Sequence, residues 1–379
     1  MQPNNPIRYS MYSKLLILAA ALCLTVCGYA QNPIELAQRA NNYFMAKWSD
    51  PTAPTNFKKH RPSNLWTRGV YYEGLMALNE VAPEARYMEY VDKWGAFHKW
   101  DVYGGKYTTV DADHQCCAQT YMARYNMIGG TEKYAAIQKN FDHQIANVAP
   151  HCWTWIDAIQ MAMPAFAMMT QITGERKYLD YAMKSYLWTR DSCGGGLFNV
   201  PEGLWWRDKN FVPPYKESDG KNCYWSRGNG WVYAALCRTM STLDKKDKYY
   251  NILKKDYLAM TKALEKLQRE DGFWNASLAS QDYAGPELSG TSLFLYGMAW
   301  GVNNGLLKRS KYQSILDKAW KACASCVHDD GFLGYVQGSG DRPASSQPCT
   351  YVREPDFDDY GLGCFLLGAT EYVRNKMSQ

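Results

Sequence analysis

The stretch TWIDAIQMAMPAFAMMTQITGERKYLDYA, residues 154–182, carries one unit of a repeated helix pair. Apolar residues recur at helical spacing over residues 158–173, and helical spacing resumes at Tyr178. The short polar element Arg176-Lys177-Tyr178 lies between the two runs. The stretch therefore predicts two consecutive helices with a short connection.

The same basic-residue–tyrosine element recurs before alternate helical runs, which indicates an internal repeat of helix pairs. It occurs at Arg86-Tyr87, Lys133-Tyr134, Lys177-Tyr178, Lys248-Tyr249 and Lys311-Tyr312. Strand-like alternation is scarce. Helical spacing is found over residues 65–80, 115–128, 158–173, 178–189, 230–243, 249–268, 291–303, 312–327 and 360–375.

About six such helix pairs fit the chain, and they favour a closed ring. An open solenoid of repeats needs capping units, whereas a ring of inner and outer helices needs none and leaves a central cleft. No linker divides the chain, so we expect one all-α (α/α)6-barrel catalytic domain over residues 31–379. The long Gly-, Pro- and Trp-rich segment 194–218 is expected to carry function, as long loops often do.

Composition indicates a large core and a cleft lined with rings. The chain has 379 residues, of which 46% are hydrophobic, and it contains 14 Trp and 29 Tyr. A core alone rarely needs so many amphipathic aromatic side chains. The 42 basic residues are spread along the chain against 37 acidic ones, which argues against a nucleic-acid-binding protein.

The N-terminus has the layout of a secretory signal peptide. Arg8 and Lys14 precede an apolar run over residues 15–26, which small residues follow at 28–31. This run is too short to span a bilayer comfortably. Cys27 follows Val26, whereas a lipoprotein anchor requires a small residue there. We expect residues 1–30 to be removed and the protein to be exported, as a periplasmic or secreted enzyme.

The cysteines predict no metal site. Ten of the twelve follow the signal segment, and their spacing gives no disulfide framework. Cys323 and Cys326 have the spacing of a zinc-binding pair, but no second such pair accompanies them in the sequence. Most of the cysteines are expected to be small buried hydrophobic residues.

The run WSRGNGW, residues 225–231, suits a sugar acid. Trp225 and Trp231 offer apolar faces for a sugar ring, and Arg227 offers a planar fork for a carboxylate. The glycines beside Asn229 allow the backbone to come close to a ligand. The alternative is a helix start with buried aromatic residues, because Gly-Asn-Gly is also common in turns.

Two aspartates stand at the starts of apolar helical runs. Asp113 and His114 open one, and Asp157 opens another directly behind Trp153 and Trp155. Either aspartate could cap its helix. An aspartate packed beside tryptophan is also where a raised pKa and proton donation are expected.

Residues 154–182 together with WSRGNGW resemble the unsaturated rhamnogalacturonyl hydrolases of glycoside hydrolase family 105, which are related to the unsaturated glucuronyl hydrolases of family 88. The resemblance extends from about Trp66 to the C-terminus and includes residues 286–307 and 360–371. It implies an (α/α)6 barrel. It also implies removal of a 4,5-unsaturated uronic acid from the non-reducing end of polysaccharide-lyase products such as those of rhamnogalacturonan.

The resemblance assigns roles to individual residues. Asp157 matches the family's catalytic acid/base, and Asp113 matches its second essential carboxylate. Tyr125 has the family's spacing into the following helix. Candidate substrate-binding residues are Trp66, His114, Trp155, Trp225, Arg227, Asn229 and Trp231.

One departure from the family lies after the Gly-rich segment. Members often carry a Leu-Tyr-His pattern there, whereas residues 204–208 read Leu-Trp-Trp-Arg-Asp. Trp206 or Arg207 is expected to take the place of the histidine and to contact the substrate.

The implied reaction uses the vinyl ether of an unsaturated uronate. An acid protonates C4, charge develops at C5 and the ring oxygen, and water adds at C5. The resulting hemiketal opens and expels the aglycone. Asp157 is expected to donate the proton, and Asp113 to orient the water or the ring hydroxyls and to keep the pKa of Asp157 high. No metal or organic cofactor is expected.

Three other functions stay open on the residues alone. A conventional glycosidase would place Asp113 and Asp157 across the anomeric centre. A sugar epimerase on the same barrel would rely on histidines, and the six in this chain form no clear pair. An exported glycan-binding protein would explain the tryptophans and Arg227, but it would leave both aspartates as mere caps.

Overall fold

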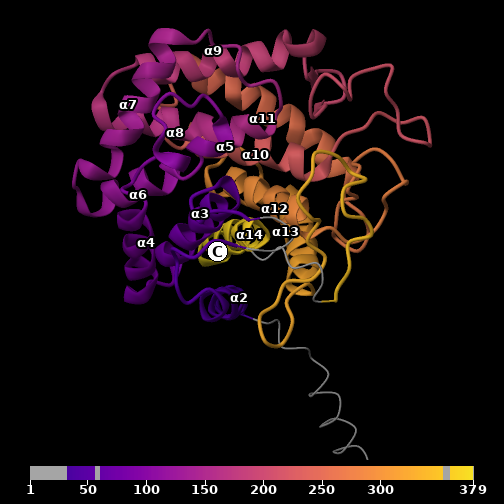
Figure 1. The fold of residues 1–379 in the computed structure, drawn as a ribbon. Helices are drawn as coiled ribbons and strands as arrows, with labels where there is room; N and C mark the ends of the chain where they lie inside the picture. The colour runs from indigo at the N-terminus through magenta and orange to yellow at the C-terminus, as the bar shows by residue number, and fades with distance from the viewer. Residues whose placement is uncertain (1–31, 56–59, 353–358, 379) are drawn as a thin grey trace, which may run out of the picture.

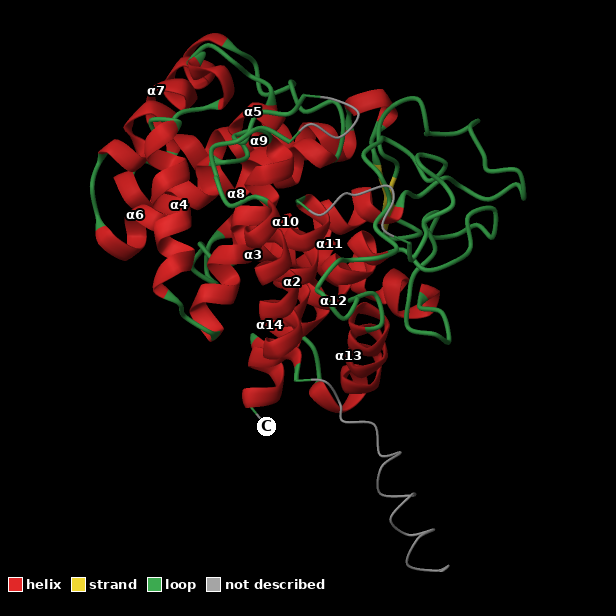
Figure 2. Cartoon of the chain, turned by 60° about the horizontal axis from the view of Figure 1, so that its bottom comes forward, coloured by secondary structure: helices red, strands yellow, loops and turns green. Residues whose placement is uncertain are grey.

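The regular secondary structure is nearly all helical in the computed structural model, which describes residues 32–55, 60–352 and 359–378. Figure 1 shows α3, α12 and α14 near the middle of the molecule and α7 and α9 at its rim. The longest loops gather on one side (Figure 2). The expected signal peptide, residues 1–30, lies outside the described residues.

Six helices form a closed inner ring. Each contacts the next in chain order, and the last packs against the first. They are α3 (Trp66–Val81), α6 (Ala118–Ile128), α8 (Asp157–Thr173), α10 (Ser226–Met240), α12 (Leu288–Asn303) and α14 (Tyr360–Met377). Nearly every residue of α10 and α12 is buried, as expected for helices that are covered on all sides.

Six further long helices surround this ring, which confirms the expected (α/α)6 barrel. They are α2 (Pro33–Lys47), α4 (Ala85–Phe97), α7 (Glu132–Asn147), α9 (Lys177–Asp191), α11 (Lys248–Leu267) and α13 (Arg309–Ala324).

The basic-residue–tyrosine element marks the first turn of five outer helices, α4, α7, α9, α11 and α13. In three of them the tyrosine hydroxyl donates a hydrogen bond to a carboxylate on the preceding outer helix. These pairs are Tyr178 with Asp142 (2.8 Å), Tyr249 with Asp180 (2.9 Å) and Tyr312 with Glu265 (3.0 Å). The repeat therefore ties neighbouring outer helices together.

Glycines close the inner ring. A Cβ atom on Gly363 of α14 would lie 2.2 Å from the carbonyl oxygen of Val70 on α3. A Cβ on Gly368 would lie 2.7 Å from the carbonyl oxygen of Ser292 on α12. Any side chain at these positions would push the helices apart, so glycine sets how closely α14 can approach both neighbours.

The remaining elements are short. They are the four-residue helix α5 (Ala112–Gln115), the 3-10 turns η1 (Tyr103–Gly105) and η2 (Cys193–Gly195), and the strands β1 (Phe198–Asn199) and β2 (Leu204–Trp205). The strands pair antiparallel, with Phe198 opposite Trp205 and Asn199 opposite Leu204. Both belong to the long segment 194–218.

Some helix boundaries differ from those expected. The run 115–128 is divided at Cys116–Cys117 into α5 and α6, and α10 begins at Ser226 and not at Gly230. Gly228 and Gly230 lie inside this helix, where only glycine fits. A Cβ on Gly228 would lie 2.8 Å from the Trp225 ring, and one on Gly230 would lie 2.8 Å from the Leu293 side chain. These glycines serve packing and not, as expected, the approach of a ligand.

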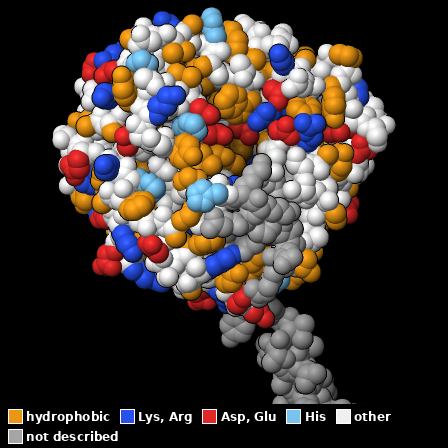
Figure 3. All heavy atoms as spheres, viewed as in Figure 1, with side chains coloured by type: hydrophobic (Ala, Val, Ile, Leu, Met, Phe, Trp, Pro, Cys, Tyr) orange, Lys and Arg blue, Asp and Glu red, His pale blue; other side chains and the backbone are white. Residues whose placement is uncertain are grey.

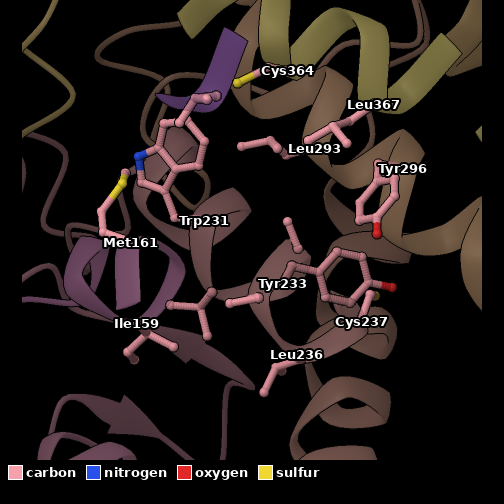
Figure 4. Close-up of a cluster of buried hydrophobic side chains, with 14 of the residues drawn as sticks. Ile159, Met161, Trp231, Tyr233, Leu236, Cys237, Leu293, Tyr296, Cys364 and Leu367 are labelled. Carbon is pink, nitrogen blue, oxygen red and sulfur yellow. The ribbon is translucent and has the colours of Figure 1, made fainter. Parts of the chain in front are cut away.

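The core is continuous through the inner ring, and Figure 4 shows one part of it around Trp231. Eight of the ten described cysteines are buried and unpaired, which agrees with the expectation of small buried residues. Within the described residues, no helix is long and apolar enough to cross a membrane.

Candidate active site

A cavity of about 280 Å³ lies where several inner helices begin. It is lined by Trp66, Asp113, Trp155, Asp157, Met161, Arg207, Gly340 and Asp341. The face of the molecule seen in Figure 3 is hollowed near its centre, where apolar, acidic and basic side chains meet. Five residues expected from the sequence at the site therefore share one cavity: Trp66, Asp113, Trp155, Asp157 and Arg207.

Asp157 is the first residue of α8, and its side chain is only 12% exposed. Burial raises the pKa of this carboxyl, whereas the Arg207 guanidinium, whose Nε lies 3.1 Å from Asp157 Oδ2, opposes the rise. The backbone holds the two residues together. Ile156 N donates to Arg207 O at 3.0 Å, and Trp155 forms an antiparallel bridge with Asp208.

Asp113 is the second residue of α5 and does not cap it. Asp111 is the N-cap, and its side chain accepts a hydrogen bond from Asp113 N at 3.0 Å. The Asp113 carboxylate makes no hydrogen bond within the described residues. Burial, together with the nearby Asp111 and Asp157 carboxylates, raises the pKa of Asp113 to about 7. Near neutral pH the cavity therefore holds a carboxyl group that is partly protonated.

Arg207 is the one cation among the described residues that line this cavity. Its side chain is 22% exposed and donates to Asp157 and, at 2.8 Å, to Asp208. Asn229 holds the strand that leads to it. The Asn229 amide accepts from Trp205 N at 2.8 Å and donates to Trp205 O at 3.0 Å. The segment 194–218, which was expected to carry function, thus places Arg207 in the cavity lining.

Arg227 is placed differently from the sequence-based expectation. It is fully buried and does not line the cavity. Its guanidinium donates to the carbonyl oxygens of Gln337 at 2.8 Å and Gly338 at 2.9 Å, and lies over the rings of Trp225 and Tyr360. Its hydrogen-bond partners are these two backbone carbonyls and, at 3.4 Å, the Ser289 hydroxyl, as for an arginine with a structural role.

The rest of WSRGNGW is also buried behind the cavity. Trp225 Nε1 donates to Gln337 Oε1 at 2.8 Å. The ring of Trp231 packs edge-on against Trp66, with 6.3 Å between ring centroids. Trp225 and Trp231 therefore do not line this cavity, and their contact with the sugar stays a prediction. Their rings fill the core, and Trp66 and Trp155 are the tryptophans that line the cavity.

Three other expected residues lie outside the cavity lining. Trp206 packs against Tyr224, and His114 contacts Thr109 through its Nδ1 at 3.0 Å. Tyr125 stands in the last turn of α6 and packs against Tyr134, at the end of α6 away from Asp113.

The cavity also includes residues that the sequence did not suggest. Gly340 and Asp341 come from the loop after Gly338, and Asp341 pairs with Arg342 at 2.8 Å. Met161 lies one turn after Asp157 on α8. The spacing from Asp157 could have identified Met161, because positions four apart share a helix face. The loop residues carry no motif.

Comparisons with known proteins agree with this geometry. Residues 36–376 match the sequence model of glycosyl hydrolase family 88. The chain belongs to this family. The resemblance to families 105 and 88 is thereby confirmed, as is the interpretation of this chain as a glycoside hydrolase.

Two relatives and one solved structure are similar to this chain over most of its length. An unsaturated 3S-rhamnoglycuronyl hydrolase of Alteromonas sp. (strain LOR) is 30% identical over 368 residues, which cover 89% of this chain and 85% of the relative. A protein of the same name from Formosa agariphila is 30% identical over 330 residues, covering 82% and 84%. A family 88 structure from Bacteroides vulgatus superposes with a TM-score of 0.79 at 29% identity, covering 90% and 98%.

We predict that Arg227→Lys destabilises this hydrolase. Lysine keeps the charge but cannot donate in a fork to two carbonyls, so the free energy of unfolding should fall by about 2–4 kcal/mol. Thermal or urea unfolding measures this. Arg342→Lys, at an exposed ion pair, is the matched control and should change stability by less than about 0.5 kcal/mol. Equal melting temperatures for Arg227→Lys and wild type would contradict the structural role.

We also predict that Asp113→Asn stabilises the fold at alkaline pH. The folded-state pKa is raised to about 7, so the stability linked to the protonated carboxyl is present at low pH and is lost as pH rises through about 7. Asparagine stays neutral throughout. The free energy of unfolding should rise by about 1–3 kcal/mol at pH 8 and hardly change at pH 4.

Unfolding curves at both pH values check this. Asp341→Asn is the control, because Arg342 lowers the pKa of Asp341 and its neutralisation should not stabilise. A gain for Asp113→Asn that is equal at both pH values would show that charge burial is not its cause.

Proposed function

We propose that this glycoside hydrolase removes a 4,5-unsaturated uronic acid from the non-reducing end of oligosaccharides that polysaccharide lyases release. The observation that carries the proposal is the cavity that buried Asp157 and half-buried Asp113 share with one arginine, Arg207. The aspartates supply acid and base. The arginine supplies the positive charge that a uronate carboxylate needs, and Trp66 and Trp155 supply apolar walls for the sugar ring.

The chemistry is hydration of a vinyl ether. Asp157 donates a proton to C4 of the C4=C5 double bond, and positive charge spreads over C5 and the ring oxygen. The conjugate carboxylate of Asp157 then assists a water molecule that adds at C5. The hemiketal opens and releases the aglycone. Burial supports the first step, because it favours the protonated form of Asp157.

Substrate binding itself favours proton donation by Asp157. In the free protein the Arg207 guanidinium stabilises the Asp157 carboxylate at 3.1 Å. A uronate carboxylate is a competing partner for the same guanidinium. As it binds Arg207, the opposing influence on Asp157 weakens and the pKa of Asp157 rises further. The acid is thereby formed when the substrate is in place.

Asp113 orients the water and the ring hydroxyls in this scheme. It is also the second candidate for the proton donor, because its own pKa is about 7 and no hydrogen bond within the described residues holds its charged form. The pH dependence of kcat/KM distinguishes the two assignments. A limb that rises with pH through about 7 requires ionised Asp113, whereas a limb that falls there requires protonated Asp113.

The relatives' name supports a rhamnose-linked unsaturated uronate as the substrate. The signal-like residues 1–30 support export, so that the enzyme acts in the periplasm or outside the cell on oligosaccharides of about disaccharide size. A panel of lyase-generated oligosaccharides, each followed by the ultraviolet absorbance of its unsaturated uronate, tests both the reaction and the preferred linkage.

We predict that Asp157→Asn lowers kcat/KM on such an oligosaccharide by at least about 100-fold while leaving the fold intact. Asparagine keeps the shape of the side chain but carries no transferable proton. Circular dichroism and the melting temperature check folding. The saturated uronide is the matched control substrate: turnover of it by wild type would favour a conventional glycosidase. Near-normal turnover by Asp157→Asn would remove Asp157 from the reaction.

We further predict that Arg207→Lys raises KM by about 10-fold or more and lowers kcat less, because the fork that grips a carboxylate is lost while the positive charge stays. The same variant should discriminate less between the uronate and its methyl ester. An unchanged KM together with an unchanged preference for the free acid would show that Arg207 serves only to hold Asp157 and Asp208.

A further inference from the structure

A second cavity, of about 410 Å³, lies at the other end of the inner ring. Whereas the catalytic cavity is lined from helix starts, this one is lined by later turns of five inner helices and by the first two turns of α6. Glu73, Gln119, Thr120, Arg238 and Tyr296 supply polar groups, and Met76, Met168 and Trp300 supply apolar ones.

An apolar layer lies between the two cavities. Met161 lines the catalytic cavity, and Tyr296 and Leu367 line the second one. Figure 4 shows Trp231 beside Met161, and Leu293 between them and Tyr296 and Leu367. Trp231 and Leu293 are fully buried. The second cavity is therefore a separate compartment and not an extension of the active site.

The inner wall of the second cavity is a hydrogen-bonded polar layer of Glu73, Gln119, Gln160 and Arg238. Gln160 Nε2 donates to Glu73 Oε2 at 2.8 Å, and Gln119 Nε2 donates to Gln160 O at 2.8 Å. That carbonyl is free of its usual helical partner because residue 164 is proline, which has no N–H. Arg238 Nε donates to Gln119 Oε1 at 2.9 Å, which fixes the guanidinium.

Polar groups without partners face this cavity. The only hydrogen bond that Arg238 makes within the described residues uses Nε, so both Nη nitrogens are left over. Thr120 is 1% exposed, and its hydroxyl has no partner. The Tyr296 hydroxyl likewise makes no hydrogen bond within the described residues. The Arg238 side chain is 20% exposed, so its Nη nitrogens are accessible to a ligand in the cavity.

The charges favour an anionic ligand. At the rim, Arg374 is neutralised by Glu371 at 2.7 Å and by Glu80. Deeper in, Arg238 has one carboxylate within reach, Glu73, at 3.7 Å. Burial raises the pKa of Glu73 to about 7, so a large fraction of Glu73 is uncharged near neutral pH. Arg238, whose side chain is 20% exposed, then has no ionised carboxylate beside it.

We propose that this cavity is a second binding site, for a small organic acid of sugar size, whose carboxylate pairs with the Nη nitrogens of Arg238. The planar guanidinium fork matches a carboxylate. The Tyr296 hydroxyl binds a hydroxyl group of the ligand, and Trp300 offers an apolar face. A monosaccharide uronate has all three features.

Binding at this site is linked to protonation of Glu73. The other charged or titratable groups that face Glu73 are Arg238 on α10, Cys116 and Cys117 after α5, and Cys364 on α14. Burial keeps the pKa of these thiols well above their usual value. Glu73 is therefore the group that titrates near neutrality. A bound anion favours its protonated form, so affinity should fall as pH rises through about 7.

Titration calorimetry with D-glucuronate tests the proposal, with D-glucose as the matched ligand that lacks the carboxylate. Two variants of the full chain are compared with wild type. Glu73→Gln removes the competing carboxylate and should keep binding while losing its pH dependence. Glu73→Gln/Arg238→Gln removes both charges, so no unpaired buried ion is left to unfold the protein. It should weaken binding by at least about 10-fold, which is the loss of one charge-assisted hydrogen-bonded pair.

The catalytic cavity is unchanged in both variants and contributes equally to all three titrations. Crystals of wild type soaked in D-glucuronate locate the ligand directly, and its carboxylate is expected at Arg238. Equal affinity of the single and double variants would overturn the proposal, as would D-glucuronate in the catalytic cavity only. Neither outcome affects the proposed hydrolysis, which depends on Asp113, Asp157 and Arg207.

Discussion

The active site depends on the buried Arg227 guanidinium, which holds two backbone carbonyls of a distant loop. Gln337 and Gly338 contribute no chemistry, but the loop that they begin brings Gly340 and Asp341 to the cavity. Two residues later on the same helix, Asn229 holds both backbone groups of Trp205 and so positions the segment with Arg207. One turn of α10 thus fixes two walls of the site. Charged and amide side chains suit this task because each satisfies several buried backbone groups at once.

This arrangement allows the reactive carboxyls to stay poorly solvated. Asp113 and Asp157 would each gain free energy from water or from a tighter cation, and both pKa values are raised by burial. A flexible loop would relax around them and admit water. The inner ring prevents this, since its helices meet at glycines with no room for a side chain. Rigidity of the barrel therefore maintains the proton affinity that acid catalysis needs.

The sequence predicted the barrel because each helix pair repeats a local pattern, and local patterns are readable without knowing distant contacts. Asp113 and Asp157 could be singled out because they open helices beside aromatic residues, whereas Arg207 was one of two alternatives, with Trp206, that the resemblance to family 105 offered; all three line one cavity. It misplaced Arg227, whose residue type suits a ligand as well as a carbonyl. The partners Gln337 and Gly338 lie more than 100 residues away in the chain, and no periodicity links them to WSRGNGW. Only the three-dimensional structure shows that the Arg227 guanidinium already has hydrogen-bond partners within the protein.

Helix α8 connects the two ends of the barrel. Asp157 begins it, Gln160 follows at the next turn and joins Glu73 and Gln119, and Pro164 lines the second cavity. Proline at this position leaves the Gln160 carbonyl without a helical partner, and Gln119 satisfies it from α6. A hydrogen bond from the Gln119 side chain on α6 therefore replaces one helical hydrogen bond in the first turn of α8. The polar layer of Glu73, Gln119, Gln160 and Arg238 thus replaces the missing helical hydrogen bond and separates the two ends of the barrel.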